Sequence, residues 1–253
     1  MQFAAPPFHI TCASLSDVGR VRSRNEDRCT CDPALRLLAV ADGMGGHAAG
    51  DVASTLALEH LTIALQNSSS RPDSSAGARL RAAVSAANTA ILDAAAGGRS
   101  GMGTTIVAAL FEADSVVVAH VGDSRLYRLR AGVLKSLTRD HSWVQDMIDR
   151  GFYSEHRARH SPRRNQLLRA LGINAELEVE LAAHTVQAGD RYLLCSDGLN
   201  GMLDEVHIAM LLGAAGAPEE RARWLVEAAN EHGGRDNVTV ALADVALADV
   251  ALA

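Results

Sequence analysis

The stretch LRLLAVADGMGG, which spans residues 35 to 46, runs from apolar residues straight into Asp42 and Gly43. A short apolar run of this kind is typical of a strand buried in a sheet. A lone carboxylate at the end of a buried strand costs free energy unless a cation compensates its charge. The stretch therefore predicts a buried strand that carries an acidic group to its end, where Gly43 permits a tight turn and an inward-facing carbonyl.

The same arrangement recurs elsewhere in the chain. Asp123 and Asp197 each follow an apolar run, Asp236 directly precedes another, and Glu26 and Asp27 add a further acidic site. An aspartate beside a glycine is, on its own, usually a turn residue. Several carboxylates at strand ends favour a shared compensating charge, and hard divalent cations take oxygen ligands of this kind.

Composition excludes several classes of protein. The chain has 253 residues, 48% of them hydrophobic and 21% charged, which is an ordinary globular balance and excludes wholesale disorder. Aromatic residues make up only 4%, so the core must be aliphatic and stacking platforms for nucleic-acid bases are not expected. The net charge of −6 also argues against nucleic-acid binding and suits a soluble enzyme or a cation binder.

Compartment and oxidation state are predicted from what the sequence lacks. No run approaches the roughly 18 apolar residues of a membrane helix, and the first ten residues do not resemble a secretory signal. We therefore expect a cytoplasmic protein without membrane insertion. Its four cysteines, too few for a disulfide scaffold, are expected to be reduced thiols: Cys12, Cys29, Cys31 and Cys195.

Periodicity predicts an α+β fold in one domain over residues 1–253, because strand runs and helix runs are segregated along the chain. Gly151–Asn165 is expected to be irregular and basic, and residues 246–253 to form a short tail. The predicted strands are Phe8–Leu15, Leu35–Ala41, a meander over Gly103–Thr138, Leu177–Leu181, Arg191–Cys195 and Asn237–Ala243. The predicted helices are Ala48–Gln66, Ala76–Ala96, His141–Arg150, Leu203–Leu212 and Pro218–His232.

A series of motifs, in family order from about Ile10 to Val240, resembles the metal-dependent serine/threonine protein phosphatases of the protein phosphatase 2C type in their compact bacterial form. The motifs are Asp17-Val18-Gly19 with Arg22 to Asp27, Ala41 to Gly50, Gly103-Thr104-Thr105, Val121 to Arg125, Leu137 to Ser142, Leu168 to Gly172, Ser196 to Leu199 and Asp236 to Thr239. The resemblance implies a β-sandwich of two mostly antiparallel sheets flanked by pairs of helices, with the metal site at one end between the sheets.

The resemblance also implies two Mn²⁺ or Mg²⁺ ions and assigns roles to the matching residues. Asp42 bridges both ions, Asp197 and Asp236 complete one of them, and Gly43, through its carbonyl, and Glu26, through water, serve the other. Asp27 orients these ligands. Asp123 matches the ligand of a third, weaker ion; the structural alternative is a turn carboxylate bonded to Arg125.

The implied reaction is direct hydrolysis of phosphoserine and phosphothreonine by a hydroxide held between the two ions, without a covalent phosphoenzyme. Arg22 matches the residue that grips the substrate phosphate; the alternative is a solvated cation in a cluster with Arg20 and Arg24. The expected partners are phosphorylated proteins, among them a serine/threonine kinase and its targets, and the protein is expected to act in signalling as a monomer. Residues 142–165 match a variable flap beside the site, whose arginines either recruit acidic segments or form a solvated charge run.

Other functions make different demands on the sequence. A serine hydrolase would use Ser124, with His141 or His160 as base, but it leaves the aspartates without a role, and a structural role for His141 is favoured. A non-catalytic phosphoprotein-binding domain on the same fold would be expected to have lost metal carboxylates. Animal members of the family carry a proton-donating histidine where this chain has Met44, so the acid is expected to be water, or otherwise His47.

Overall fold

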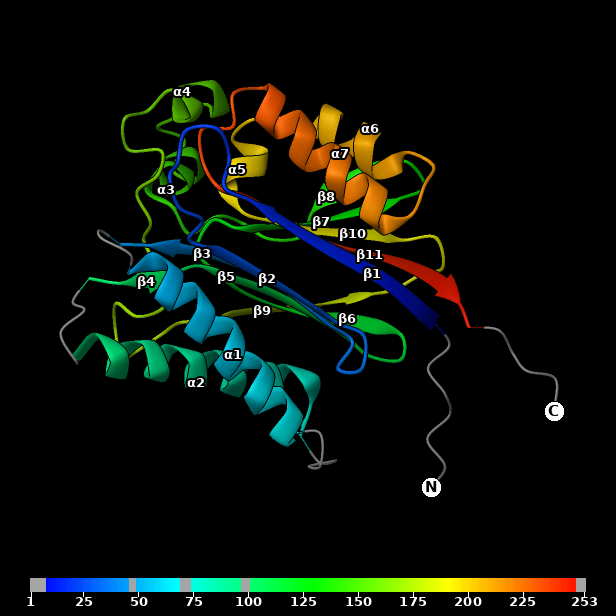
Figure 1. Ribbon diagram of the computed structural model, residues 1–253, viewed down its shortest axis with the longest axis horizontal. Coiled ribbons are helices and arrows are strands. Elements are labelled where there is room, and N and C mark those ends of the chain that lie inside the picture. The colour runs from blue at the N-terminus through cyan, green and yellow to red at the C-terminus, as the bar shows by residue number, and fades with distance from the viewer. Residues whose placement is uncertain (1–7, 46–48, 69–73, 97–100, 249–253) are drawn as a thin grey trace.

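Two antiparallel sheets lie face to face, with helices on both outer surfaces, in a computed structural model of the chain (Figure 1). The structure describes residues 8–45, 49–68, 74–96 and 101–248. The first sheet has the order β1 (Phe8–Asp17), β11 (Val238–Leu247), β10 (Arg191–Cys195), β7 (Arg125–Arg130) and β8 (Val133–Ser136). The second has the order β2 (Asp27–Asp32), β3 (Leu37–Met44), β5 (Ile106–Phe111), β6 (Ser115–Val121) and β9 (Glu180–Thr185), with β4 (Gly103–Thr104) also paired to β3.

Strand β3 shows why the chain folds into four layers, which are two central sheets and the helices on either side of them. Leu37 and Ala39 belong to the core beneath the helices, whereas Leu38 and Val40 belong to the core between the sheets. Side chains alternate across a strand, so an unbroken apolar run buries both faces. This confirms the predicted α+β sandwich flanked by helices.

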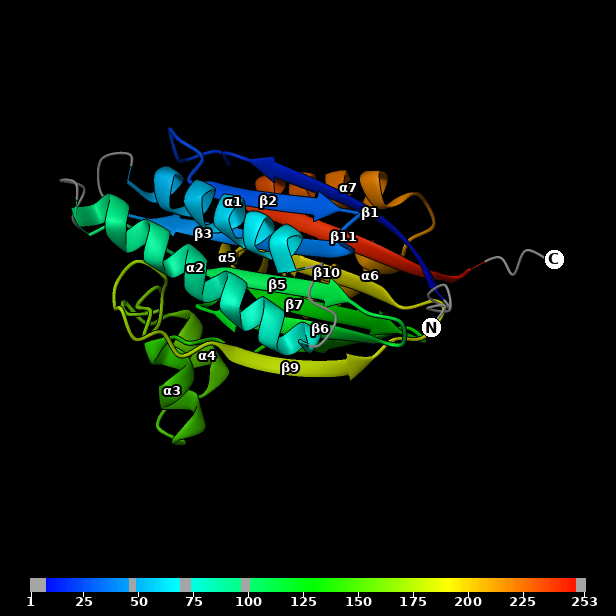
Figure 2. The ribbon, with the colours of Figure 1, turned by 90° about the horizontal axis from the view of Figure 1, so that it is seen from below.

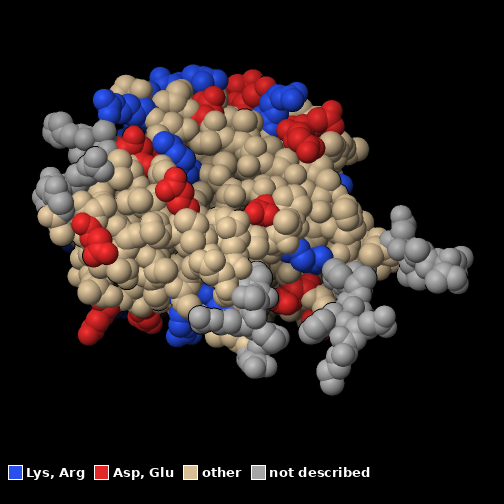
Figure 3. Space-filling view, turned by 60° about the horizontal axis from the view of Figure 1, so that its bottom comes forward, with Lys and Arg blue, Asp and Glu red and all other residues tan. Residues whose placement is uncertain are grey.

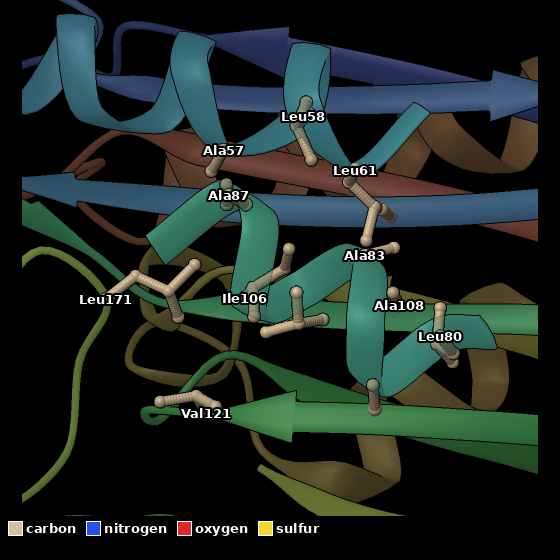
Figure 4. Packing of buried hydrophobic residues seen from close by; sticks show 14 of the residues in the cluster. Ala57, Leu58, Leu61, Leu80, Ala83, Ala87, Ile106, Ala108, Val121 and Leu171 are labelled. Atoms are coloured by element: carbon tan, nitrogen blue, oxygen red, sulfur yellow. The ribbon is translucent and has the colours of Figure 1, made fainter. Parts of the chain in front are cut away.

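Two Ala-rich helices, α1 (Gly50–Ser68) and α2 (Ala76–Ala96), cover the second sheet (Figure 2). Small residues such as Ala57, Ala83 and Ala87 lie where the helices meet (Figure 4). Their size lets the backbones approach closely, while Leu61 and Leu80 fill the remaining space against the sheet. Figure 3, in which this side of the molecule comes forward, shows a central area with few charged side chains.

Helices α6 (Glu205–Gly213) and α7 (Pro218–Glu231) cover the first sheet. The side chain of Asp204 caps the start of α6, and Pro218 occupies the first turn of α7, where its missing N–H is not needed. Shorter helices lie near one end of the sandwich: α3 (Trp143–Asp149), α4 (Glu155–Arg159) and α5 (Asp197–Asn200). In the described part of the chain no helix is long and apolar enough to span a bilayer.

Several predicted boundaries were wrong. Strand β2 has the sequence DRCTCD, whose polar residues gave no apolar signal, and β9 lies at Glu180–Thr185 instead of 177–181. The stretch predicted to be irregular contains helix α4, capped by Ser154. Strand β11 continues to Leu247 because it pairs with β1 along its whole length, so the predicted tail begins later; residues 249–253 lie outside the described part.

The prediction of four reduced thiols was also wrong. Cys12 in β1 and Cys31 in β2 form a disulfide with a Cα–Cα distance of 6.4 Å, while Cys29 and Cys195 are free. Strands β1 and β2 are edge strands of different sheets. Sequence spacing alone could not show that these two edges meet, because their proximity is a property of the sandwich.

Candidate metal centre

The sequence-predicted site residues line one cavity of about 230 Å³. Arg22, Gly43, Asp123, Asp197 and Asp236 are among them, although they come from five separate parts of the chain. The remaining lining residues are Glu26, Asp42, Met44, Gly45, Thr105, Asn165, Leu167 and Asn237. Among all the residues that line the cavity, Arg22 carries the only permanent positive charge.

Strand pairing explains how these carboxylates meet. Asp27 and Asp42 lie opposite each other in the β2–β3 pair. Asp197 follows β10, and Asp236 precedes β11, the neighbouring antiparallel strand. In an antiparallel pair, the end of one strand lies beside the start of the next, so the topology places all four groups at the same end of the sandwich.

The backbone of Asp42 is fixed by Thr105 on both sides. The Asp42 N–H donates to Thr105 Oγ1 at 3.0 Å, and the Thr105 N–H donates to the Asp42 carbonyl at 2.9 Å. Glycine is required at position 43 because the start of α1 comes so close that a Cβ there would lie 2.2 Å from the Gly50 carbonyl oxygen. The strand therefore delivers the Asp42 carboxylate from a rigid backbone.

Burial, together with neighbouring carboxylates, raises the pKa of three aspartates of the cavity. Burial, and then the charges of the neighbouring aspartates, raise the pKa of Asp42 and of Asp123 well above the usual range. Burial, and then the charges of Asp236 and Asp27, raise the pKa of Asp197 to about 7. Such a set of oxygen donors, short of positive charge, fits hard divalent cations.

Asp27 lies beneath the cavity instead of lining it. It is 2% exposed and accepts a hydrogen bond from Ser196 Oγ at 2.7 Å. Burial raises its pKa to about 6, against the hydrogen bond from Ser196. The same serine hydroxyl accepts from the Thr239 N–H at 3.1 Å, so Asp27 joins β2 to the strands that carry Asp197 and Asp236.

Arg22 lines the cavity and bonds one of its aspartates, so its partner differs from that of Arg20. Its Nη2 donates to Asp236 Oδ2 at 2.7 Å, whereas Arg20 pairs with Asp17. Half of the Arg22 side chain remains exposed. The guanidinium therefore keeps N–H groups available at the cavity mouth.

The loop that carries Arg22 and Glu26 is fastened by Asn237, a residue to which the sequence gave no role. Asn237 Nδ2 donates to the carbonyls of Val18 and Arg24 at 2.9 and 2.8 Å, and Asn237 Oδ1 accepts from the Glu26 N–H at 2.9 Å. Its position directly after Asp236, in the motif Asp236 to Thr239, was the signal that the sequence offered. One amide thus couples the loop to the strand that delivers Asp236.

Asp123 is not held by Arg125, which was the structural alternative. Arg125 makes a two-pronged ion pair with Asp140, at 2.8 and 2.7 Å, and Asp123 faces the cavity. Gly122 adopts φ +115°, a conformation that favours glycine, and this turn directs Asp123 inward.

His141 supports that turn. The Gly122 N–H donates to His141 Nδ1 at 3.1 Å, and the His141 N–H donates to the Gly122 carbonyl at 2.7 Å. A neutral ring that accepts at Nδ1 carries its proton on Nε2, where Glu180 Oε2 lies 2.9 Å away. The ring of His120 stacks on His141 with centroids 4.6 Å apart and 31° between the planes.

His120, His141 and Glu180 offer ligand atoms within 4.8 Å of one another, which is a spacing that a metal ion could use. A metal on His141 Nε2 would require the proton to move to Nδ1, where the Gly122 N–H already points. His141 therefore supports the turn before Asp123, which agrees with the structural role favoured for this residue.

The geometry does not assemble a serine hydrolase. Ser124 is fully buried and its Oγ bonds Thr105 Oγ1 at 2.7 Å. His141 bonds Gly122 and Glu180, and His160 Nδ1 bonds the His156 carbonyl. His47, the second candidate for the acid, lies outside the described residues.

Comparison with known proteins agrees with this geometry. The family model described as "Protein phosphatase 2C" matches residues 20–230. Serine/threonine protein phosphatase PstP of Mycobacterium tuberculosis is 45% identical over 240 residues, which is 92% of this chain but 44% of the relative's length. Serine/threonine phosphatase stp of Listeria monocytogenes is 39% identical, over 90% of this chain and 93% of its own.

A solved structure has the same fold. The crystal structure of the catalytic domain of PstP in complex with two manganese ions superposes with a TM-score of 0.86 at 41% identity, covering 94% of this chain and 99% of that one.

Proposed function

The chain belongs to the protein phosphatase 2C family, and from that membership we propose that it hydrolyses phosphoserine and phosphothreonine on proteins. The observation that supports this most is the set of carboxylates around one cavity, with Arg22 at the mouth. The proposed cofactors are two Mn²⁺ or Mg²⁺ ions, with a third, weaker ion at Asp123. A relative carries two manganese ions in its structure.

The ligand roles follow the resemblance, and the cavity fits them. Asp42 would serve both ions, Asp197 and Asp236 would serve one, and Glu26 and the Gly43 carbonyl would serve the other. When bound, two such ions lower the pKa of water and neutralise the charge on the phosphoryl oxygens, so that hydrolysis needs no covalent phosphoenzyme. The rigid Asp42 backbone, fixed by Thr105, supplies the positional accuracy that such a reaction requires.

Arg22 holds the substrate phosphate. Its guanidinium can offer paired N–H groups to two phosphate oxygens, which is a geometry that lysine lacks. Its bond to Asp236 places it at the cavity mouth before substrate arrives. Because Asn237 fastens the surrounding loop, Arg22 loses little conformational freedom on binding.

Water supplies the proton to the leaving group. Met44 lines the cavity at the position where animal relatives carry histidine, and its thioether has no proton to give. No histidine is among the described residues that line the cavity, and His141 is engaged with Gly122 and Glu180. This agrees with a choice of water over a side chain.

The proposed partners are phosphorylated proteins, with a serine/threonine kinase acting in opposition. A phosphoprotein-binding domain without catalysis would not need the intact carboxylate set. The proposed location is the cytoplasm, and thiol trapping in cells tests it. A Cys12–Cys31 disulfide that persists in the cell would place the protein in an oxidising compartment instead.

The function is tested with a phosphothreonine peptide. Activity should be lost after exhaustive EDTA treatment and return with Mn²⁺. Asp42→Asn should be folded, by circular dichroism, and nearly inactive, while Asp93→Asn, the same change at an exposed site on α2, should match the wild type. Full activity in EDTA, or normal turnover by Asp42→Asn, would show that the cavity is not the catalytic centre.

A further inference from the structure

A second cavity, of about 430 Å³, lies in the segment that contains α3 and α4. It is lined by Tyr153, His156, Arg157, His160, Ser161 and Pro162. Residues 150–165 contain five arginines and one acidic residue, in a chain whose net charge is −6. This segment is therefore the strongly basic part of an acidic protein.

Most of these arginines lack an acidic partner. Arg150 pairs with Asp146 at 2.9 Å. In contrast, within the described residues no ion pair is made by Arg157, Arg159, Arg163 or Arg164. Their positive charges remain available to a ligand.

Aromatic rings hold two of the free guanidinium groups in place. Arg157 lies 4.0 Å from the centroid of the Tyr153 ring, and Arg163 lies 5.0 Å from that of Trp143. The only described hydrogen bond of the Arg157 guanidinium is a 3.5 Å contact to the Phe152 carbonyl. Stacking fixes the plane of a guanidinium while leaving its N–H edge free for an anion.

The second cavity lies close to the first along the chain. Pro162 lines one and Asn165 the other, so their Cα atoms are at most about 11 Å apart. Backbone contacts join the two ends of the segment. Ser142 and Leu167 form an isolated β-bridge, and the Trp143 N–H donates to the Gln166 carbonyl at 2.8 Å. The two cavities are thus neighbours on one segment, whose ends are joined by backbone hydrogen bonds.

We propose that the second cavity binds another acidic group of the same phosphoprotein: a second phosphoryl group or neighbouring carboxylates. This inference rests on the proposed function and names its substrate class. A planar guanidinium beside two histidines suits a phosphate or carboxylate, whose oxygens accept several hydrogen bonds at once. An extended peptide advances about 3.3–3.6 Å per residue, so about 11 Å between the two Cα atoms corresponds to three residues, and the reach of the side chains beyond them extends the range to roughly five.

The test compares three phosphothreonine peptides that differ only at the distant position, which carries a second phosphothreonine, a Glu-Glu pair or a Gln-Gln pair. The distance is varied from two to six residues on either side. In the wild type, KM should be about tenfold lower for an acidic peptide than for the Gln-Gln peptide, with an optimum near three to five residues. Preference for the phosphorylated peptide alone assigns the cavity to a phosphoryl group, and equal preference for the Glu-Glu peptide assigns it to any acidic pair.

Variants locate the effect. Arg157→Ala should reduce the KM advantage to about twofold, and Arg157→Lys should restore part of it, since the charge returns without the planar fork. Arg150→Ala, in the same segment but already paired with Asp146, should keep the full advantage. Equal KM values for acidic and Gln-Gln peptides, or an advantage that survives Arg157→Ala, would overturn the inference. Nitrophenyl phosphate, which has no peptide, separates the two ideas: if the wild type fails to hydrolyse it with Mn²⁺, the proposed function itself fails.

Discussion

Replacing Asp197 by Asn should stabilise the metal-free protein while removing its response to metal. Burial and its acidic neighbours raise the pKa of Asp197 from 3.8 to about 7. This rise in pKa means that the folded state disfavours the charged form of Asp197 by on the order of 4 kcal/mol relative to the unfolded state. We discount this to about 2 kcal/mol because water reaches the cavity, which for a chain of this size is about 4–8 °C in melting temperature.

The dependence on pH has a definite sign. Between about pH 4 and pH 7 the folded protein keeps the Asp197 proton that the unfolded chain has lost, so wild-type stability falls as the pH rises through this window. The gain from Asp197→Asn should therefore be small near pH 4, grow up to about pH 7, and stay constant above it.

Thermal melting in EDTA and in Mn²⁺, over this pH range, measures the effect. The wild type should gain stability with Mn²⁺ and Asp197→Asn should gain little. Asp190→Asn is the matched control of opposite sign: Asp190 is also buried, but its bonds to Arg130 and neighbours lower its pKa, so its loss should destabilise the protein. If Asp197→Asn lowered the metal-free melting temperature as Asp190→Asn does, the carboxylates would not be held together against their repulsion, and the reasoning for a metal centre would be refuted.

Three further changes test other parts of the structure. Arg22→Ala should raise KM and weaken inhibition by phosphate, with kcat/KM lower by about 1.5–3 kcal/mol, while Mn²⁺ still raises the melting temperature; unchanged phosphate inhibition would remove Arg22 from the phosphate site. Cys12→Ser should lower the free energy of unfolding by about 3 kcal/mol in denaturant titrations, since the disulfide with Cys31 spans 19 positions; a reductant should bring the wild type to the same value, and a midpoint that ignores both would argue against the bond. His141→Asn should keep more Mn²⁺-dependent turnover than His141→Leu, because the Asn oxygen can still accept from the Gly122 N–H; equal loss in both would show that this bond does not support the turn.

The elements with strong periodicity were predictable from sequence. Helix α2 and strand β10 have the predicted bounds, because one has apolar residues at helical spacing up to a pair of glycines and the other is a short apolar run. Strand β2 was not predictable, since its sequence, DRCTCD, is stabilised by pairing with β3 and not by its own pattern. Propensity and periodicity report local preference, whereas pairing can impose a strand on a polar sequence.

The candidate site divides in the same way. The acidic residues at strand ends, Asp42, Asp123 and Asp197 among them, were visible because a carboxylate beside a buried apolar run is unusual enough to notice. The groups that hold them were not visible, because an Asn or Thr in a loop has no distinguishing pattern. Asn237 makes its three hydrogen bonds to residues 211 to 219 positions away.

This division follows from the electrostatics of the cavity. Carboxylates that repel one another cannot hold themselves together, so their positions must be set by neutral groups: the Thr105 backbone and hydroxyl for Asp42, the Asn237 amide for the Arg22 loop and the Gly122 turn for Asp123. Each of these groups donates or accepts without adding charge, and each contacts a segment remote in sequence. The residues that carry the chemistry can therefore be recognised from short sequence motifs, whereas the groups that hold them in place come from many parts of the fold. For that reason, changes at Asn237 should impair activity through the loop geometry even though Asn237 is not assigned as a metal ligand.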